Sequence, residues 1–301
     1  MIYPAPLRKG DKIAIVSPAS HIRHEYVDGA CRIIEQWGYE PVVGAHCKGV
    51  CGTYSGTVEE RLADLTAAFA DKSVKAILCS RGGYGVVHLL ERIDSSLLSD
   101  NPKWVIGFSD ISALHAALTT AGVVSLHAPM TKQFAEKGAD DECVGIIRSV
   151  VEGTLPAYRE PWHEFNRPGV AEGQLVGGNL AVLCGLRGSR FDILKGDKIL
   201  FIEDVNEQVY AVERMLYALR LGGVLGNLRG LIVGRFTDYH NPDGNGESME
   251  QMVRRMVEPY GYPVAFDFPI GHIDRNLPII EGADVRLDVA ASSTSLRFVM
   301  R

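Results

Sequence analysis

Short apolar runs alternate with helically spaced apolar stripes through the first half of the chain, and this alternation limits the possible folds more than any other feature. The runs that we expect to form strands are residues 12–17, 41–43, 76–79, 104–108 and 123–126. Between the first two, apolar residues recur at helical spacing from Val27 to Trp37 and stop at Gly38. Repeated β-α units predict a parallel sheet with helices on both faces and a ligand site at the carboxyl ends of its strands.

The middle of the chain has a different composition, which marks a boundary between two domains. Residues 137–172 are rich in charge, glycine and proline, with one possible helix near residues 142–151, and we expect them to form a linker. The N-terminal domain is then expected to span residues 1–136 and the C-terminal domain residues 173–301. In the second domain, the apolar runs at residues 285–289 and 296–300 are typical of closing antiparallel strands.

Composition and charge argue against several classes of partner. The 301 residues are 46% hydrophobic and 23% charged, as in ordinary globular proteins. The formal net charge is −6 and the basic residues form no block, so we expect neither nucleic acid nor an anionic membrane as a partner. The first residues lack the apolar core of a signal peptide, and no stretch is long enough to span a membrane. We therefore expect a cytoplasmic protein.

Cysteine usage fits the same expectation. Six cysteines are scattered through the chain, and several of them lie in apolar runs. This usage is typical of reduced, buried thiols rather than of a disulfide framework. His46, Cys47 and Cys51 form a small cluster of metal-ligating types, but no second half of a zinc site follows them. We therefore expect no metal.

Ser109 follows the apolar run 104–108 and precedes a helical stripe that includes Ile111 and Leu114. It therefore lies at an expected strand-to-helix junction, where unpaired N–H groups and the positive end of the helix dipole surround its hydroxyl. This is the position of the serine in a nucleophile elbow. Serine is also a preferred N-cap residue, so a purely structural role is the alternative.

A serine nucleophile needs a general base. Among the nine histidines, His272 lies in a glycine-flanked loop and His127 lies just past an expected strand end, so both are candidates. His115 falls on a different face of the helix after Ser109, and His88 is compatible with an ordinary surface position. Any of these histidines could equally be a solvated side chain with no catalytic role.

Two further features could complete such a site. Glu203 ends an apolar strand and could orient an imidazole, with Asp204 as an equal rival. The turn Gly82-Gly83-Tyr84-Gly85 follows the expected strand 76–79, and adjacent glycines allow the backbone to approach a substrate closely, as in an oxyanion hole. A phosphate cradle and a tight turn without a ligand are the alternatives. The spacing, however, matches neither G-x-G-x-x-G nor a P-loop.

Several short motifs occur in an order that is similar to one known family. They are Leu7-Arg8-Lys9-Gly10-Asp11, Ile15-Val16-Ser17-Pro18, Arg81-Gly82-Gly83-Tyr84-Gly85, Gly107-Phe108-Ser109-Asp110, Asn166-Arg167-Pro168-Gly169, Gly177-Gly178-Asn179-Leu180, Leu200-Phe201-Ile202-Glu203-Asp204 and Gly271-His272. In this order and spacing the motifs resemble the LD-carboxypeptidase family of serine peptidases, and they run nearly from end to end of the chain. That family includes murein tetrapeptide carboxypeptidases and microcin-immunity peptidases.

The resemblance implies a Ser-Glu-His triad, with Ser109 as nucleophile, Glu203 as orienting carboxylate and His272 as base. It also implies an oxyanion hole formed by the backbone N–H groups of Gly83 and Asp110. The family fold has an N-terminal parallel-sheet α/β domain that carries the serine. A smaller β-rich C-terminal α/β domain carries the other two, so the active site is expected at their interface. The resemblance implies no metal or other cofactor, and a homodimer.

The resemblance further implies a serine carboxypeptidase that removes the terminal D-alanine from muropeptide tetrapeptides during cell-wall recycling. A microcin-type aminoacyl-nucleotide is the alternative substrate, although residues 151–173 include no long insertion that could clamp a nucleotide. A non-enzymatic protein that binds a small ligand is another alternative. The sequence departs from the family at Gly188-Ser189, where Gly-Thr is expected. Ile111 replaces the second glycine of G-x-S-x-G, which argues against a true α/β-hydrolase fold.

Overall fold

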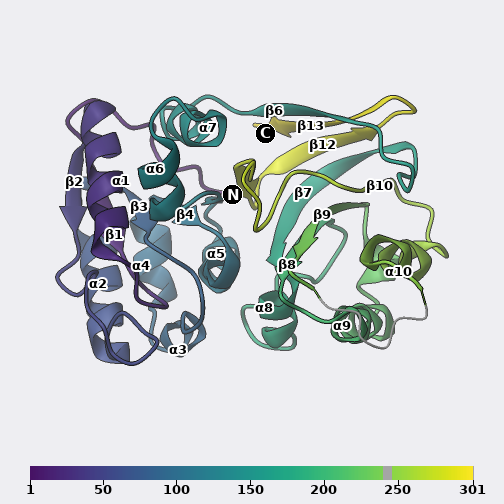
Figure 1. The fold of residues 1–301 in the computed structure, drawn as a ribbon, viewed down its shortest axis with the longest axis horizontal. Helices are drawn as coiled ribbons and strands as arrows, with labels where there is room; N and C mark the ends of the chain where they lie inside the picture. The colour runs from purple at the N-terminus through teal and green to yellow at the C-terminus, as the bar shows by residue number, and fades with distance from the viewer. Residues whose placement is uncertain (240–245, 301) are drawn as a thin grey trace. The chain divides into compact units, whose positions relative to one another are not determined.

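The structure is a computed structural model that describes residues 1–239 and 246–300 (Figure 1). The chain divides into two compact units. The first unit comprises Met1–Leu155 and Leu277–Gly282, and the second comprises Pro156–Asn276 and Ala283–Arg301. Each unit has its own sheet and its own helices, so the expected two-domain α/β fold, with a mostly parallel first sheet and a β-rich mixed second sheet, is confirmed.

The sheet of the first unit is built in the way that the apolar runs predict. Its strands are β1 (Lys12–Val16), β2 (Glu40–Val43), β3 (Val74–Cys79), β4 (Trp104–Gly107), β5 (Ser125–His127) and β11 (Ile279–Glu281). They are ordered β11-β5-β4-β3-β1-β2, and all neighbours are parallel except β11, which is antiparallel to β5. All four residues of β4 are buried, as expected for a parallel strand covered on both faces.

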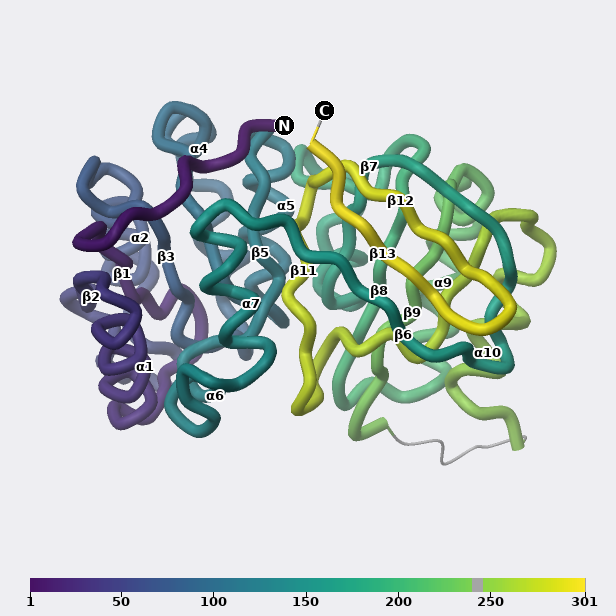
Figure 2. Tube along the Cα trace, turned by 90° about the horizontal axis from the view of Figure 1, so that it is seen from above, coloured from purple at the N-terminus to yellow at the C-terminus, as the bar shows by residue number. Residues whose placement is uncertain are grey.

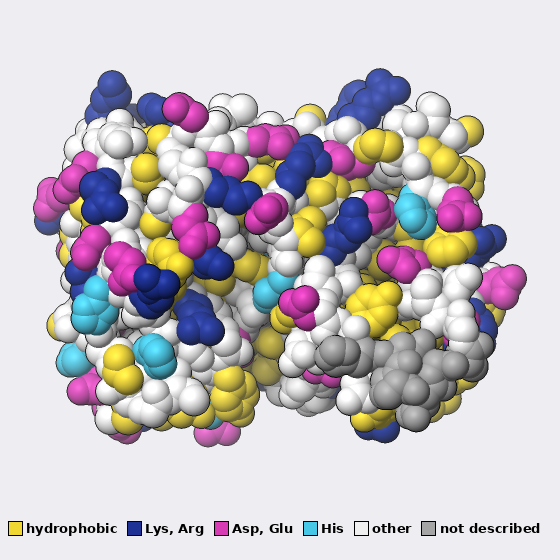
Figure 3. Space-filling model, viewed as in Figure 1, with side chains coloured by type: hydrophobic (Ala, Val, Ile, Leu, Met, Phe, Trp, Pro, Cys, Tyr) yellow, Lys and Arg dark blue, Asp and Glu magenta, His cyan; other side chains and the backbone are white. Residues whose placement is uncertain are grey.

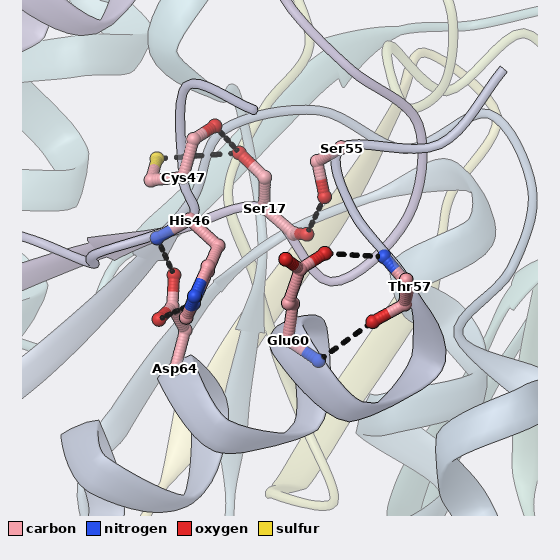
Figure 4. A network of polar contacts seen from close by, with 7 residues as sticks. All are labelled: Ser17, His46, Cys47, Ser55, Thr57, Glu60 and Asp64. Atoms are coloured by element: carbon pink, nitrogen blue, oxygen red, sulfur yellow. Dashed lines mark hydrogen bonds and ion pairs between the residues drawn. The ribbon is translucent and has the colours of Figure 1, made fainter. Parts of the chain in front are cut away.

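Two groups of helices cover this sheet. The helices are α1 (His24–Gln36), α2 (Val58–Ala70), α3 (Val87–Leu90), α4 (Ser95–Asp100), α5 (Ser112–Thr120), α6 (Thr131–Lys137) and α7 (Glu142–Val151). Helices α2 to α5 contact one another, and α1 and α7 each contact α6. Figure 2 shows α2, α4 and α5 on one side of the strands and α1, α6 and α7 on the other. The expected capping box opens α2, since Thr57 and Glu60 exchange hydrogen bonds of 2.8 and 3.2 Å (Figure 4).

The strand order creates a switch point at the carboxyl ends of β1 and β3. From β1 the chain runs outward through α1 to the edge strand β2, and it then returns through α2 to β3 on the other side of β1. Ligands of open parallel sheets bind at such points. The turn 82–85 follows β3 and Ser109 follows β4, so both come from strand ends at or beside the switch point.

The second unit has a mixed sheet of seven strands. They are β6 (Ala157–Pro161), β7 (Gly169–Asn179), β8 (Ile199–Val205), β9 (Gly230–Thr237), β10 (Val264–Ala265), β12 (Asp284–Val289) and β13 (Ser293–Val299). In the order β10-β9-β8-β7-β12-β13-β6, the first four are parallel and the rest pair antiparallel, so the expected closing pair β12-β13 is confirmed. The helices of this unit are α8 (Leu180–Gly185), α9 (Val209–Leu221) and α10 (Met249–Val257).

The segment 137–172 differs from the linker that its composition predicts. It contains α7, which belongs to the first unit, and β6, which belongs to the second. Helix α7 forms because Cys143, Val144, Ile147, Val150 and Val151 bury one apolar face, and Asp141 caps its first turn. The chain passes from one unit to the other between Leu155 and Pro156.

Charged side chains of both signs are mixed on the surface. On the face shown in Figure 3, basic and acidic side chains are interspersed, and neither sign forms a continuous patch. Among residues 1–239 and 246–300, no helix combines the length and the apolar character that a bilayer crossing requires.

His115 is a buried part of the first unit's core. It is 1% exposed on α5, and its Nε2 lies 2.8 Å from the carbonyl oxygen of Gly107 in β4. Its Nδ1 lies 2.8 Å from Ser125 Oγ in β5. A carbonyl only accepts, so Nε2 carries the proton and Nδ1 accepts from the hydroxyl. Burial lowers the pKa of His115 to about 4.

This low pKa predicts a pH-dependent contribution of His115 to stability. The unfolded chain binds a proton at His115 below a pH of about 6.5, whereas the folded chain does not do so until about 4. The contribution of His115 to the free energy of unfolding should therefore fall as the pH drops through this window, by up to about 1.4 kcal/mol per pH unit. Urea denaturation from pH 7 to 4 should show the stability difference between wild type and His115→Asn shrinking. A constant difference contradicts the prediction.

Candidate functional site

Ser109 lies at a sharp turn between β4 and α5. Phe108 is extended (φ −149°), Ser109 has a φ of +65°, and residues 109–111 form a 3₁₀ turn before α5 begins. The N-cap alternative is therefore wrong, because an N-cap residue is extended and Ser109 is left-handed. A left-handed conformation costs a non-glycine residue about 1–2 kcal/mol. Such strain at a strand-to-helix turn is typical of an exposed nucleophile.

The turn 82–85 lies directly against Ser109. A Cβ atom on Gly82 would be 2.8 Å from Ser109 Cβ and 3.2 Å from the Asp110 nitrogen, so only glycine allows this approach. Gly83 has a φ of +100°, and a Cβ there would be 2.3 Å from Ser20 Oγ. Ser20 fixes the turn, since its N–H donates to Gly82 O (3.2 Å) and its hydroxyl accepts from the Tyr84 N–H (3.3 Å).

The two N–H groups expected to form the oxyanion hole belong to this arrangement. Within the part of the chain that the structure describes, neither the Gly83 N–H nor the Asp110 N–H donates to a protein acceptor. Backbone donors without a protein partner at a strand-to-helix turn are suited to stabilise a developing negative charge.

The side chain of Asp110 has a separate role that the sequence does not suggest. It is 4% exposed, and its Oδ2 accepts from the Val86 N–H at 2.9 Å. Burial raises the pKa of Asp110 to about 6. The carboxyl group thus links the turn at Ser109 to the end of the turn 82–85.

In the second unit, Glu203 and His272 form a hydrogen-bonded pair. His272 Nδ1 lies 2.8 Å from Glu203 Oε2, the glutamate is fully buried, and the histidine side chain is 21% exposed. An ionised carboxylate only accepts, so we assign the proton to Nδ1. The lone pair then lies on Nε2, as a general base requires.

Local geometry explains why Glu203, and not Asp204, meets the histidine. Successive strand residues face opposite sides of a sheet. Asp204 Oδ1 accepts from Asn179 Nδ2 at 2.8 Å, and its Oδ2 accepts from the Ala181 N–H at 2.9 Å, at the start of α8. Burial and the neighbouring Glu203 charge raise the pKa of Asp204 to about 6. Asp204 is therefore committed to the fold.

The loop that carries His272 depends on a glycine. Gly271 has a φ of +124°, and a Cβ there would lie 3.0 Å from both Cβ and Oε2 of Glu203. The Gly271 N–H donates at 3.0 Å to Oδ1 of Asn276, which is fully buried. Asn276 was not suggested by the sequence, because an asparagine in a loop ordinarily indicates a turn.

The rival histidines lie in other environments. His115 serves the core, as described above. His127 is fully buried, and its ring meets Phe108 edge-on at 5.9 Å. His88 contacts Arg61 and lies against the ring of Tyr84.

A second histidine–carboxylate pair lies in the first unit (Figure 4). His46 Nδ1 is 2.9 Å from Asp64 Oδ1, and Asp64 also accepts from the His46 N–H at 2.9 Å. His46 follows the edge strand β2, which is three positions from β4 in the sheet. The pair therefore fixes the loop after β2.

The structure thus assembles the predicted residues in two groups. Ser109, Asp110 and the turn containing Gly83 form one group in the first unit. Glu203 and His272 form the other in the second unit. The sequence did not suggest the supporting side chains of Ser20, Arg61 and Asn276.

Gly271→Ala should separate His272 from Glu203. The methyl group would meet Glu203 at 3.0 Å, and the φ of +124° would strain an alanine, at a cost of order 1–3 kcal/mol. We expect the NMR signal of the His272 Nδ1–H to broaden or disappear. Gly261→Ala is the matched control, because an added Cβ there meets nothing within 4 Å. An unchanged signal in Gly271→Ala contradicts the tight approach.

Comparison with known proteins gives a consistent assignment. The LD-carboxypeptidase N-terminal domain matches residues 13–128, and the LD-carboxypeptidase C-terminal domain matches residues 172–287. The chain is 35% identical to the probable murein peptide carboxypeptidase of Bacillus subtilis (95% of this chain, 92% of the relative). It is 30% identical to the murein tetrapeptide carboxypeptidase of Pseudomonas aeruginosa (88% and 89%). The crystal structure of muramoyltetrapeptide carboxypeptidase from Oxalobacter formigenes superimposes with a TM-score of 0.88 at 26% identity (96% and 99%). The chain therefore belongs to the LD-carboxypeptidase family.

Proposed function

We propose that this protein is a serine carboxypeptidase that removes the terminal D-alanine from murein tetrapeptides. Ser109 is the nucleophile, His272 the general base and Glu203 the group that orients it. The observation that carries the proposal is the 2.8 Å hydrogen bond between His272 Nδ1 and the buried Glu203. A buried carboxylate on Nδ1 selects the tautomer in which Nε2 can take a proton.

The first half of the proposed reaction forms an acyl-enzyme. His272 Nε2 takes the hydroxyl proton of Ser109 as the oxygen attacks the carbonyl carbon of the scissile bond. Negative charge on the carbonyl oxygen is stabilised by the N–H groups of Gly83 and Asp110, each typically worth about 3–4 kcal/mol in such sites. The imidazolium then gives its proton to the nitrogen of the departing D-alanine, and the C–N bond breaks.

In the second half of the reaction, water hydrolyses the acyl-enzyme. Water enters where the amine left, and His272 takes one of its protons as the oxygen attacks the ester carbon. The same two N–H groups stabilise the second oxyanion. Collapse returns the proton to Ser109 and releases the shortened peptide. Apart from the substrate and this water, the groups named in these steps are side chains and backbone groups of the chain.

The substrate class is supported by the relatives. The relatives at 35% and 30% identity are a probable murein peptide carboxypeptidase and a murein tetrapeptide carboxypeptidase, respectively. In the proposed substrate, the scissile bond joins the L-centre of the third residue to the terminal D-alanine. A cytoplasmic location in cell-wall recycling is also part of the proposal, as is the homodimer that the family resemblance implies.

Substitution of the base tests the proposed triad with a control inside the same chain. His272→Gln should lower kcat for release of D-alanine at least about a thousandfold, because the nucleophile loses its proton acceptor. His46→Gln removes a histidine with the same carboxylate geometry, 2.9 Å instead of 2.8 Å, and should retain wild-type activity. Equal losses in both variants, or activity in His272→Gln, contradict the triad.

The substrate can be tested by mass spectrometry of matched peptides. The purified protein should remove one alanine from a murein tetrapeptide that ends in D-alanine, and it should leave the epimer that ends in L-alanine intact. An aminoacyl-nucleotide of the microcin type provides a third reaction. Cleavage of the nucleotide without cleavage of the tetrapeptide contradicts the proposed substrate, and stoichiometric binding without turnover indicates a binding protein.

A further inference from the structure

The turn 82–85 is held by a buried arginine that the proposed mechanism does not use. Arg61 lies near the start of α2 and is 2% exposed. Its guanidinium donates to three backbone carbonyl groups, which are those of Pro18 (2.7 Å), Gly85 (2.9 Å) and Gly56 (3.2 Å). It therefore joins the end of the glycine turn to the segments that follow β1 and precede α2.

Arg61 reaches these carbonyls without an ion pair. Among the described residues, no carboxylate forms a salt bridge with its guanidinium, which lies over the ring of Tyr54 at 4.9 Å instead. Burial lowers the pKa of Arg61. A buried charge is costly unless its hydrogen bonds are satisfied, so the three carbonyls and the ring must offset that cost.

Asp110, the residue after Ser109, restrains the same turn. Asp110 Oδ2 accepts from the N–H of Val86, next to the Gly85 carbonyl that Arg61 binds. A Cβ on Gly85 would lie 2.8 Å from Arg61 Nη1, so the backbone and the guanidinium are in close contact. Two buried charged side chains thus restrain a segment whose glycines at 83 and 85 would otherwise allow many conformations.

We propose that Arg61 is a positioning residue for the oxyanion hole: by fixing the Gly85 carbonyl it holds the Gly83 N–H beside Ser109 and the Asp110 N–H. This inference rests on the proposed function, because it assumes that Ser109 reacts and that these N–H groups receive the oxyanion. It predicts that loss of Arg61 slows bond formation at Ser109 and leaves substrate affinity largely unchanged.

The test uses Arg61→Ala and Arg61→Lys in the full chain, with Lys103→Ala as the matched control. Lys103 is also a buried cation that donates to backbone carbonyls, those of Ala68 (2.8 Å) and Asp71. It precedes the amino end of β4, whereas Ser109 follows the carboxyl end. The first readout is the rate at which a fluorophosphonate labels Ser109, which needs no peptide substrate. The second is kcat and KM for the tetrapeptide, with and without millimolar guanidinium.

We expect both Arg61 variants to be labelled at least about tenfold more slowly than wild type, and kcat to fall by a similar factor with KM changed less than about threefold. Guanidinium should restore much of the rate in Arg61→Ala, because it can occupy the vacated cavity, and should not affect Lys103→Ala. If Arg61→Ala does not fold, the labelling rate of Arg61→Lys tests the inference, because lysine keeps the charge but cannot span the three carbonyl groups.

Labelling of both Arg61 variants at the wild-type rate overturns the inference, as does an equal loss in Lys103→Ala, which would indicate a general effect on stability. Absence of labelling in wild type instead overturns the proposed function together with it. Labelling that is normal in wild type and slow only in the Arg61 variants supports both.

Discussion

The arrangement of the candidate site in the first unit depends on the strained backbone of Ser109. Ser109 holds a left-handed backbone between a fully buried strand and a helix, and the surrounding segments must permit this turn. Gly82 does so because it has no side chain that would overlap Ser109. The buried carboxyl group of Asp110 accepts a hydrogen bond from the Val86 N–H, just after the turn 82–85. The strained residue follows β4, beside the switch point of the sheet, where ligands of open parallel sheets bind.

Two histidine–carboxylate pairs with nearly identical geometry show that such a pair does not by itself define a base. His46–Asp64 fixes a loop after the edge strand β2, whereas His272–Glu203 lies on a glycine-dependent loop with a fully buried carboxylate. The proposal assigns the chemistry to the second pair because its motif matches the family. In this proposal, the nucleophile belongs to the first unit and the base to the second.

Much of this arrangement could be predicted from the sequence, since apolar runs and helical stripes are local signals. The five parallel strands of the first sheet, the capping box of α2 and the junction at Ser109 follow from such patterns. The sign of the Ser109 φ angle, the burial of Arg61 and the choice of Glu203 over Asp204 depend on neighbours distant in sequence. The antiparallel strand β11 was missed for the same reason, because its partner β5 lies about 150 residues earlier.

The central claim is that Ser109 of the first unit is activated by His272 of the second. The most direct measurement is the site and rate of covalent labelling by a fluorophosphonate in wild type and in His272→Gln, followed by peptide mapping. The account predicts a single adduct on Ser109 in wild type and labelling slower by at least about a hundredfold in His272→Gln. An adduct on another residue, or equal rates in the two proteins, would contradict it.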